Sequence, residues 1–482
     1  MEIGRAGSRL CITTSLVLQL NISSELLSFS EMLVQRTRYV LIICYDYPRI
    51  SSAGVIRTYQ LAKRLPEFGW QPVILTAQAC DKKCDDNIEI SDGALPCRKV
   101  VVPPMTFLAP FRFHHPGSPL QPGGADSATN GRRARLLRLA DRLAVPDGKI
   151  GWLVPAVKHG VQIERDYPIE ACLSVSPRPT AHLVACRVAR RLNIPWVADF
   201  ALPWSDAYWL AGRPRAIESL DKKLEKLVVR SAQHVTVAYT EIRRTLGARY
   251  GQDCHEKITV IPTGFDEDLF TERNPSAWAK FTVVYPGNHF CEEGRYGEYF
   301  LRAIDQWINL NPALEDKVEF VFIGKRDDAL LHHRVAMAHP EVIRVEPLMS
   351  HRECIRAILS SDACVVNTVG NRIPAKVYEC MRAGKWILAL TDQGSYLENL
   401  IRDYSKGLSV PARDMSGIRH ALQSTLQRRD SNQSEPTEAD PILNRYSSSH
   451  SAERLCHIFE SLLATSSLGC GIVSSQPHTK QG

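Results

Sequence analysis

Short, continuously apolar runs recur along this chain, and segments of helical length separate them. The first run, residues 38–44 (RYVLIIC), is rich in β-branched side chains and does not alternate with polar ones, which is typical of a parallel strand buried on both faces. A loop and Gly54 follow, then a helical stretch over residues 55–68 that ends at Gly69, and a second strand over residues 71–76. This strand–loop–helix–strand unit predicts a doubly wound α/β fold.

The pattern repeats in two series. The first places strands at residues 38–44, 71–76, 171–175, 196–199, 235–237 and 258–261. The second places them at residues 282–285, 318–323, 343–345, 363–367 and 386–390. A chain of 482 residues is long enough for two or three domains. We therefore expect two Rossmann-like domains, over residues 38–270 and 281–426, that face each other across a cleft.

The remaining segments are less regular. Residues 1–37 hold only a diluted apolar stretch, which predicts a poorly ordered leader. Residues 103–131 are crowded with Pro and Gly, which predicts an irregular insertion, either a lid or a disordered loop. Near the C-terminus we expect a polar loop over residues 427–440, a helix over residues 441–465 and an unstructured tail over residues 466–482.

The charge balance limits the partners. Lys and Arg number 59 and Asp and Glu 52, so the net charge is +7, which does not call for nucleic acid and is compatible with an anionic membrane or a phosphate ligand. Five arginines between residues 132 and 142 decorate a leucine-bearing stretch, RRARLLRLADRL, with the spacing of a basic amphipathic helix. Two interpretations stay open for this stretch: a solvated helix face, or peripheral contact with an anionic membrane.

The cysteines indicate a reducing compartment. The chain has 14, spread singly, and several stand in apolar strand or helix patterns: Cys44, Cys172, Cys186, Cys364 and Cys380. This distribution predicts buried, reduced thiols and a cytoplasmic location. No run of about 18 apolar residues, the length that a membrane-spanning helix needs, occurs in the sequence.

The expected ligand position is the cleft between the carboxyl ends of both sheets. Neither a complete G-x-G-x-x-G nor a G-x-x-x-x-G-K-[ST] motif is present, so the sequence supports neither dinucleotide nor Walker-type nucleotide chemistry. The most informative stretch is residues 371–384, NRIPAKVYECMRAG, where Pro374 suits a first helical turn and Lys376 and Glu379 share a helix face. A helix start with a Lys suits a diphosphate, and a carboxylate beside it can accept two sugar hydroxyls. The alternative is an ordinary helix N-terminus.

Several segments together resemble the family 4 glycosyltransferases of the GT-B fold, particularly bacterial members that build surface polysaccharides. In chain order these are LIICYDYPRISSAGVIRTYQLAKRLPEFGWQPVILT, SVSPRPTAHLVA, IPWVADFALPW, ITVIPTGFDEDLF, VVYPGNHF, VEFVFIGK and IPAKVYECMRAGKWILAL. They extend from about residue 38 to residue 410. The resemblance implies transfer of a sugar from a nucleotide diphosphate sugar to a polysaccharide or lipid-linked acceptor, with retention of configuration and with no metal or other cofactor.

On the donor side the resemblance assigns five residues. Glu379 matches the second glutamate of the family's E-x7-E element and is expected to bind the ribose hydroxyls. Lys376 and Arg295 are expected to neutralise the diphosphate, and Gly287 to let its loop approach the donor. Asn371 stands where the first glutamate of E-x7-E is expected.

On the acceptor side the resemblance assigns Gly54, Arg57 and His182, with Asp199 as the candidate for acid–base or positioning work. For Asp199 the alternative is a simple cap of the next segment, and for His182 a hydrogen-bonded, partly buried histidine. Asp266, Glu267 and Asp268 imitate a D-x-D metal motif, but their place after a domain-closing strand predicts a loop cap.

The sequence also departs from the family's pattern. Besides Asn371, Ala201 and Leu202 replace an Arg and an Asp of the common DFRDPW segment, and Thr263 replaces the Asn of the usual I-P-N-G turn. These departures keep two alternatives open: a GT-B protein that binds a nucleotide or a partner without turnover, and a nucleotide-sugar epimerase on the same fold.

Overall fold

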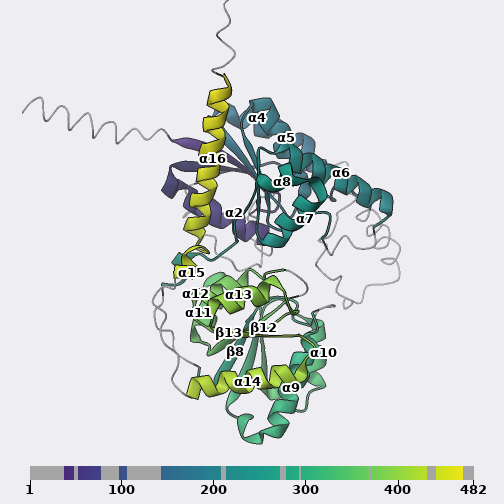
Figure 1. The fold of residues 1–482 in the computed structure, drawn as a ribbon, viewed down its shortest axis with the longest axis vertical. Helices are drawn as coiled ribbons and strands as arrows, with labels where there is room; N and C mark the ends of the chain where they lie inside the picture. The colour runs from purple at the N-terminus through teal and green to yellow at the C-terminus, as the bar shows by residue number, and fades with distance from the viewer. Residues whose placement is uncertain are drawn as a thin grey trace, which may run out of the picture.

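The computed structural model describes residues 37–47, 53–77, 97–105, 143–207, 213–271, 278–291, 295–368, 372–430 and 441–470. They form two units, one above the other in Figure 1, each built on a wholly parallel sheet. The N-terminal sheet has the strand order β3-β2-β1-β4-β5-β6-β7, and the C-terminal sheet has the order β10-β9-β8-β11-β12-β13. In both sheets the order reverses beside the first strand of the unit, which is the topology of a doubly wound fold.

The N-terminal strands are β1 (Arg38–Ile43), β2 (Trp70–Thr76), β3 (Arg98–Val101), β4 (Ile169–Val175), β5 (Trp196–Phe200), β6 (His234–Val237) and β7 (Ile258–Val260). One face of this sheet packs against α4 (Leu153–Gln162), α5 (Pro179–Leu192), α6 (Arg215–Ser231), α7 (Thr240–Tyr250) and α8 (Gln252–Glu256). The other face packs against α2 (Ala53–Arg64), the 3-10 helix η1 (Leu65–Phe68) and the C-terminal helix α16 (Ser448–Cys470).

The C-terminal strands are β8 (Phe281–Pro286), β9 (Val318–Ile323), β10 (Ile343–Glu346), β11 (Ala363–Asn367), β12 (Trp386–Leu390) and β13 (Gly407–Val410). One face of the sheet packs against α9 (Gly297–Leu310), α10 (Asp328–Val335) and α14 (Met415–Asp430). The other packs against α11 (His351–Ser360), α12 (Lys376–Arg382) and α13 (Tyr396–Tyr404).

Burial on both faces explains why the strands do not alternate. In β1, Leu41 and Ile43 contribute to the core under α4 and α5, while Val40 and Ile42 contribute to the core under α2 and α16. Successive strand residues point to opposite faces, so a strand with helices on both sides needs apolar residues at every position. The prediction from residues 38–44, a parallel strand buried by helices on both faces of the sheet, is therefore confirmed.

The end of the chain returns to the N-terminal unit. After the short helix α15 (Pro441–Asn444), helix α16 lies along the N-terminal unit beside α2 (Figure 1), and Phe459 packs on Trp70 with ring centroids 5.0 Å apart. Gly264, at φ +69°, lies where a Cβ atom would meet the Tyr446 carbonyl oxygen at 2.0 Å. Only glycine allows this contact between the linker and the turn ahead of α16.

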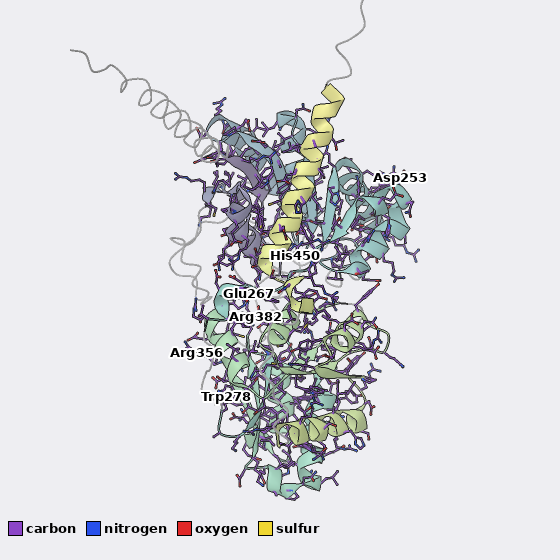
Figure 2. All side chains as sticks on the ribbon, turned by 60° about the vertical axis from the view of Figure 1, so that its left-hand side comes forward. Asp253, Glu267, Trp278, Arg356, Arg382 and His450 are labelled. Atoms are coloured by element: carbon purple, nitrogen blue, oxygen red, sulfur yellow. The ribbon has the colours of Figure 1, made fainter. Side chains whose placement is uncertain are left out.

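Ion pairs hold the linker between the units. Asp266 accepts hydrogen bonds from Lys63 and Arg64 of α2, both at 2.6 Å, and its side chain caps the 3-10 helix η6 (Glu267–Leu269). On the other side of the linker, Glu267 pairs with Arg382 of α12 at 2.8 Å, and Figure 2 shows both residues between the two units. The prediction that residues 266–268 act as a loop cap is confirmed.

The structure corrects several sequence-based boundaries. Strands β3 and β13 were not predicted, helix α14 continues to Asp430 inside the expected polar loop, and α16 continues to Cys470 inside the expected tail. The expected C-terminal helix is two helices, α15 and α16. The five cysteines named above are free and buried, as predicted.

Other predictions fall on residues outside the described ranges. These are the leader up to residue 36, most of the insertion, the arginine-rich stretch up to residue 142, and Asn371. No helix in the described part of the chain is long and apolar enough to cross a membrane.

Candidate active site

The C-terminal sheet reverses its strand order between β8 and β11, and the loops after these two strands meet. Asn367, the last residue of β11, donates from Nδ2 to the Phe290 carbonyl oxygen in the loop after β8, at 3.1 Å. In open α/β sheets, ligands bind outside the carboxyl ends of the strands at such a reversal. This edge of the sheet is therefore the first place to look for a donor site.

Gly287 and Gly324 bring two backbone segments close at this edge. The Gly287 amide donates to the Ile323 carbonyl oxygen at 3.0 Å, and a Cβ atom on Gly324 would lie 2.4 Å from the Gly287 carbonyl oxygen. The loops after β8 and β9 thus pack backbone against backbone. A side chain at Gly324 would force them apart.

A cluster of three charged or polar side chains lies where α11 and α12 begin. Glu379 accepts a hydrogen bond from Lys376 Nζ at Oε2, at 2.8 Å, and its Oε1 lies 2.7 Å from His351 Nε2. Lys376 and Glu379 share a face of α12, as their spacing predicts, while His351 begins α11 and enters the cluster through tertiary packing. Glu379 is only 3% exposed, whereas the side chains of Lys376 and His351 are 27% and 14% exposed. The cluster therefore has a buried anion and an accessible cationic edge.

The electrostatics keep Glu379 ionised. Burial alone would raise its pKa, but the charges of Lys376 and His351 outweigh burial and lower the pKa of Glu379 to about 2. Burial would likewise lower the pKa of Lys376, yet the Glu379 carboxylate raises it above its usual range. A carboxylate has about four acceptor positions, so Glu379 can accept further hydrogen bonds beyond these two.

Helix α12 begins later than the sequence suggests. Its first residue is Lys376 and its N-cap is Ala375, so Pro374 lies ahead of the helix rather than in its first turn. Arg295 lies after β8, where it donates to the Tyr285 hydroxyl at 3.5 Å. The structure thus places Arg295 after β8 and Lys376 after β11, which are adjacent strands of the sheet.

The N-terminal residues lie in a different environment. Arg57 of α2 donates two hydrogen bonds to the Asp199 carboxylate of β5, from Nε at 2.7 Å and from Nη2 at 2.8 Å. The Thr236 hydroxyl donates to the same carboxylate at 2.5 Å. Arg57 also donates from Nη1 to the Pro262 carbonyl oxygen at 3.0 Å. The two side chains are 2% and 1% exposed. This geometry favours the positioning role for Asp199 over proton transfer.

His182 is a core residue. Its Nδ1 lies 2.7 Å from the Ser174 hydroxyl, and its ring stacks on Phe200 with centroids 4.7 Å apart. Burial lowers the pKa of His182 to about 4, so the imidazole is neutral at physiological pH. The interpretation of a buried, hydrogen-bonded histidine fits this geometry.

Gly54 serves close packing. A Cβ atom there would lie 2.0 Å from the Ser176 carbonyl oxygen, so only glycine lets α2 begin against the loop after β4. Gly54, Arg57 and Asp199 therefore tie α2 to the carboxyl edge of the N-terminal sheet.

Two contacts join the units near this region. Ile373, just ahead of α12, packs against the hydrophobic cores of both units. Burial raises the pKa of Tyr239, after β6, to about 12, although the nearby charge of Arg372 acts to lower it. The residues that follow β11 therefore face the carboxyl edge of the N-terminal sheet.

Sequence reasoning missed His351 and Tyr239. A signal for the first was present, because Ser350 and Glu353 form a capping box that marks His351 as the first residue of a helix. Nothing in the local sequence shows that this histidine meets Glu379. That contact depends on how α11 and α12 pack under the sheet.

No family model matches this chain, and no curated protein matches it. Its structure nevertheless aligns with a glycosyltransferase from Rickettsia africae at a TM-score of 0.57 and 13% identity, over 89% of this chain and 99% of that one. Sucrose-phosphate synthase from Thermosynechococcus elongatus aligns at a TM-score of 0.53 and 17% identity, over 89% and 98%. The chain has the GT-B fold.

The same fold also carries a different named activity. A putative UDP-N-acetylglucosamine 2-epimerase from Listeria monocytogenes aligns with this GT-B chain at a TM-score of 0.53 and 11% identity, over 89% of this chain and 97% of the other. At these identities the likeness concerns the fold. The predicted α/β fold of two Rossmann-like domains is confirmed.

Proposed function

We propose that this chain is a glycosyltransferase that moves a sugar from a nucleotide diphosphate sugar to a polysaccharide or lipid-linked acceptor, with retention of configuration. The observation that carries the proposal is the cluster of Lys376, Glu379 and His351 at the strand-order reversal of the C-terminal sheet. An ionised carboxylate with free acceptor positions suits a ribose diol, and the ammonium beside it suits a diphosphate. The named activities of two aligned structures agree with this choice.

In this proposal the chain's own cations stabilise the leaving diphosphate. Lys376 and Arg295 follow adjacent strands, so they can approach a diphosphate from two sides. Charge neutralised in this way needs no divalent ion at the donor site. Gly287 and Gly324 keep the loops narrow where the phosphates would lie.

On the acceptor side, Asp199 acts as a positioning residue. Its carboxylate holds Arg57 and Thr236 and has no exposed edge, so it orders the start of α2 rather than receiving a proton from the acceptor. The acceptor would lie between α2 and the facing C-terminal loops.

A peripheral membrane location is part of the proposal, because a lipid-linked acceptor lies at the inner face of the membrane. Between α4 and α5 the N-terminal unit has a groove of about 520 Å³ with apolar walls and with Lys158, Arg187 and Arg191 among its lining residues. Val154, at its edge, is 64% exposed. Apolar side chains bordered by cations are typical of surfaces that adsorb to anionic lipid.

The decisive experiment measures nucleotide binding first. Calorimetry with a panel of nucleoside diphosphates should give one binding nucleotide, and Glu379→Gln should weaken it tenfold or more, because each charge-assisted hydrogen bond contributes roughly 1.5–3 kcal/mol. Asp403→Asn, the same change at an exposed carboxylate of the C-terminal unit, is the matched control and should bind normally. Equal binding by the intact protein and Glu379→Gln would contradict the proposed donor site.

Product analysis then separates the alternatives. A transferase releases the nucleoside diphosphate from its donor, slowly by hydrolysis and faster when membrane extract supplies an acceptor. An epimerase, the activity named for one aligned structure, converts the sugar with no acceptor present. Binding with neither reaction would favour the non-catalytic alternative.

A further inference from the structure

A second cluster of ligand-type side chains lies at the opposite end of the C-terminal sheet. Glu315 precedes β9, while His339 caps, and Glu341 lies within, the 3-10 turn Pro340–Val342 before β10. His339 Nδ1 lies 3.3 Å from Glu315 Oε1 and 3.6 Å from Glu341 Oε1, and one ligand atom from each residue lies within 4.8 Å of the others. Because these residues stand at the amino ends of parallel strands, the cluster is remote from the donor site at the carboxyl ends.

A neighbouring amide fixes the direction of the His339 lone pair. His339 Nε2 lies 3.0 Å from Asn309 Oδ1, so the ring donates its Nε2 proton to that oxygen. In the neutral ring, Nδ1 then carries the lone pair, and it faces two carboxylates. Histidines that bind metals characteristically donate their other N–H to such an acceptor.

The backbone of the turn is also held. Asp305 of α9 accepts hydrogen bonds from the amides of Ala338 and His339, at 3.0 and 3.1 Å. The imidazole thus stands on an anchored turn, and its side chain is 17% exposed.

The spacing suits a tetrahedral ion. Zinc bonds of about 2.0–2.2 Å to nitrogen and oxygen give tetrahedral edges of about 3.3–3.5 Å between ligand atoms. The two distances from His339 Nδ1 to the carboxylates, 3.3 and 3.6 Å, are close to such edges. An imidazolium between the carboxylates is the metal-free explanation of the same contacts.

We propose that Glu315, His339 and Glu341 form a zinc site, with water as the fourth ligand and Asn309 as the second-shell partner of the histidine. An ion there would link the turn before β9 to the turn before β10, which is the edge strand of the sheet. The site is independent of the proposed transferase activity.

The experiment uses the full chain after treatment with a chelator and its removal. Titration with zinc chloride should give saturable binding of one ion per chain and a higher midpoint of thermal unfolding. Cobalt(II) in place of zinc should give visible absorption bands of a tetrahedral or five-coordinate site. Chelation should leave nucleoside diphosphate binding unchanged, because the cluster is remote from Glu379.

Variants assign the ion to this cluster. Glu341→Gln and His339→Ala should each weaken zinc binding at least tenfold, and Asn309→Ala by about tenfold through the second shell. The control is His332→Ala/His333→Ala, which removes the neighbouring pair of histidines on α10 and should leave the affinity unchanged. Absence of saturable binding, no cobalt bands, or equal affinity in Glu341→Gln would overturn the proposal in favour of the imidazolium pair.

Discussion

Charged side chains lie at the carboxyl edges of both sheets, but they are used differently. In the N-terminal unit, Arg57 and Asp199 are 2% and 1% exposed and satisfy each other. In the C-terminal unit, Glu379 is likewise buried, at 3% exposed, but its partner Lys376 is 27% exposed. The difference shows that a charged residue in a strand-end loop points to function only when part of its hydrogen-bonding capacity remains open to a ligand.

The sealed pair has a structural consequence. Arg57 joins α2, β5 and the linker at Pro262, three segments that are distant in the sequence. Burying a charge is costly unless its partner is present, so either residue alone would be strongly unfavourable. Four experiments test this contrast between a sealed and an open cluster.

The largest effect is expected at Arg57. Arg57→Ala leaves Asp199 buried without its cation, so the N-terminal unit should lose about 3–5 kcal/mol of unfolding free energy. Arg57→Met combined with Asp199→Leu should recover most of this loss, because no charge remains buried. Unfolding by denaturant measures the free energy of unfolding of both variants. If Arg57→Ala loses no more of it than an exposed control, Arg190→Ala, the Arg57–Asp199 pair is not the structural contact that its burial indicates.

The next effect is acid lability at His182. Its pKa is about 4 in the folded chain against an ordinary value of 6.5, so the unfolded chain binds the extra proton first as the pH falls. The contribution of His182 to the free energy of unfolding is therefore fully present above pH 6.5. It is lost as the pH falls to about 4, and the loss is about 3 kcal/mol at most.

His182→Gln removes this titration. Thermal midpoints recorded from pH 7 to pH 4 should fall less steeply in His182→Gln than in the intact chain or in a control, His420→Ala, at an exposed position. Parallel pH profiles in all three would show that His182 does not drive the acid response. His234, whose pKa burial also lowers to about 4, contributes to the remaining slope.

A smaller effect is expected at His351 in the open cluster. His351→Ala removes one hydrogen bond to Glu379 and should weaken nucleoside diphosphate binding about three- to tenfold, equivalent to about 1 kcal/mol. His351→Gln keeps a donor of similar reach and should restore most of the affinity. Calorimetry measures the nucleoside diphosphate affinity of both variants. If His351→Ala lowers the midpoint of thermal unfolding but leaves this affinity unchanged, His351 is purely structural.

The smallest effect concerns the groove between α4 and α5. Lys158→Glu should weaken adsorption to anionic vesicles by about 1 kcal/mol per basic group near the surface. Lys317→Glu makes the same charge change on the C-terminal unit and is the control. Co-sedimentation at low salt compares the two, and equal loss in both would assign adsorption to net charge alone.

The sequence allowed the central strands and the edge strands β7 and β10 to be predicted, whereas the other two edge strands, β3 and β13, were missed. Apart from Arg38 and Asn367 at their ends, the buried strands β1 and β11 consist of apolar or aromatic residues, whereas β3 (RKVV) and β13 (GLSV) are short and partly exposed. A partly exposed edge needs no continuous apolar run, so its sequence resembles a loop. The path of α16 was missed for a related reason, because an apolar helix face does not specify which unit it covers.

Local spacing accounts for the part of the candidate site that was anticipated. Lys376 and Glu379 meet because residues three apart share a helix face, whatever surrounds them. The resemblance to the glycosyltransferase family selected Gly54, Arg57, His182 and Asp199. It contains no information on whether those side chains face a ligand or the core.

Long-range packing decided that question. Arg57 and Asp199 are 142 positions apart, His351 and Glu379 are 28 apart, and His339 lies 24 positions from Glu315. Such pairs form only when whole helices dock on the sheets, because periodicity extends over a few residues while burial depends on every element around a side chain. The fold class, the strand runs and the i,i+3 pair followed from local pattern. Tertiary structure decided that Asp199 is buried against Arg57, that His351 contacts Glu379, and that Glu315 contacts His339.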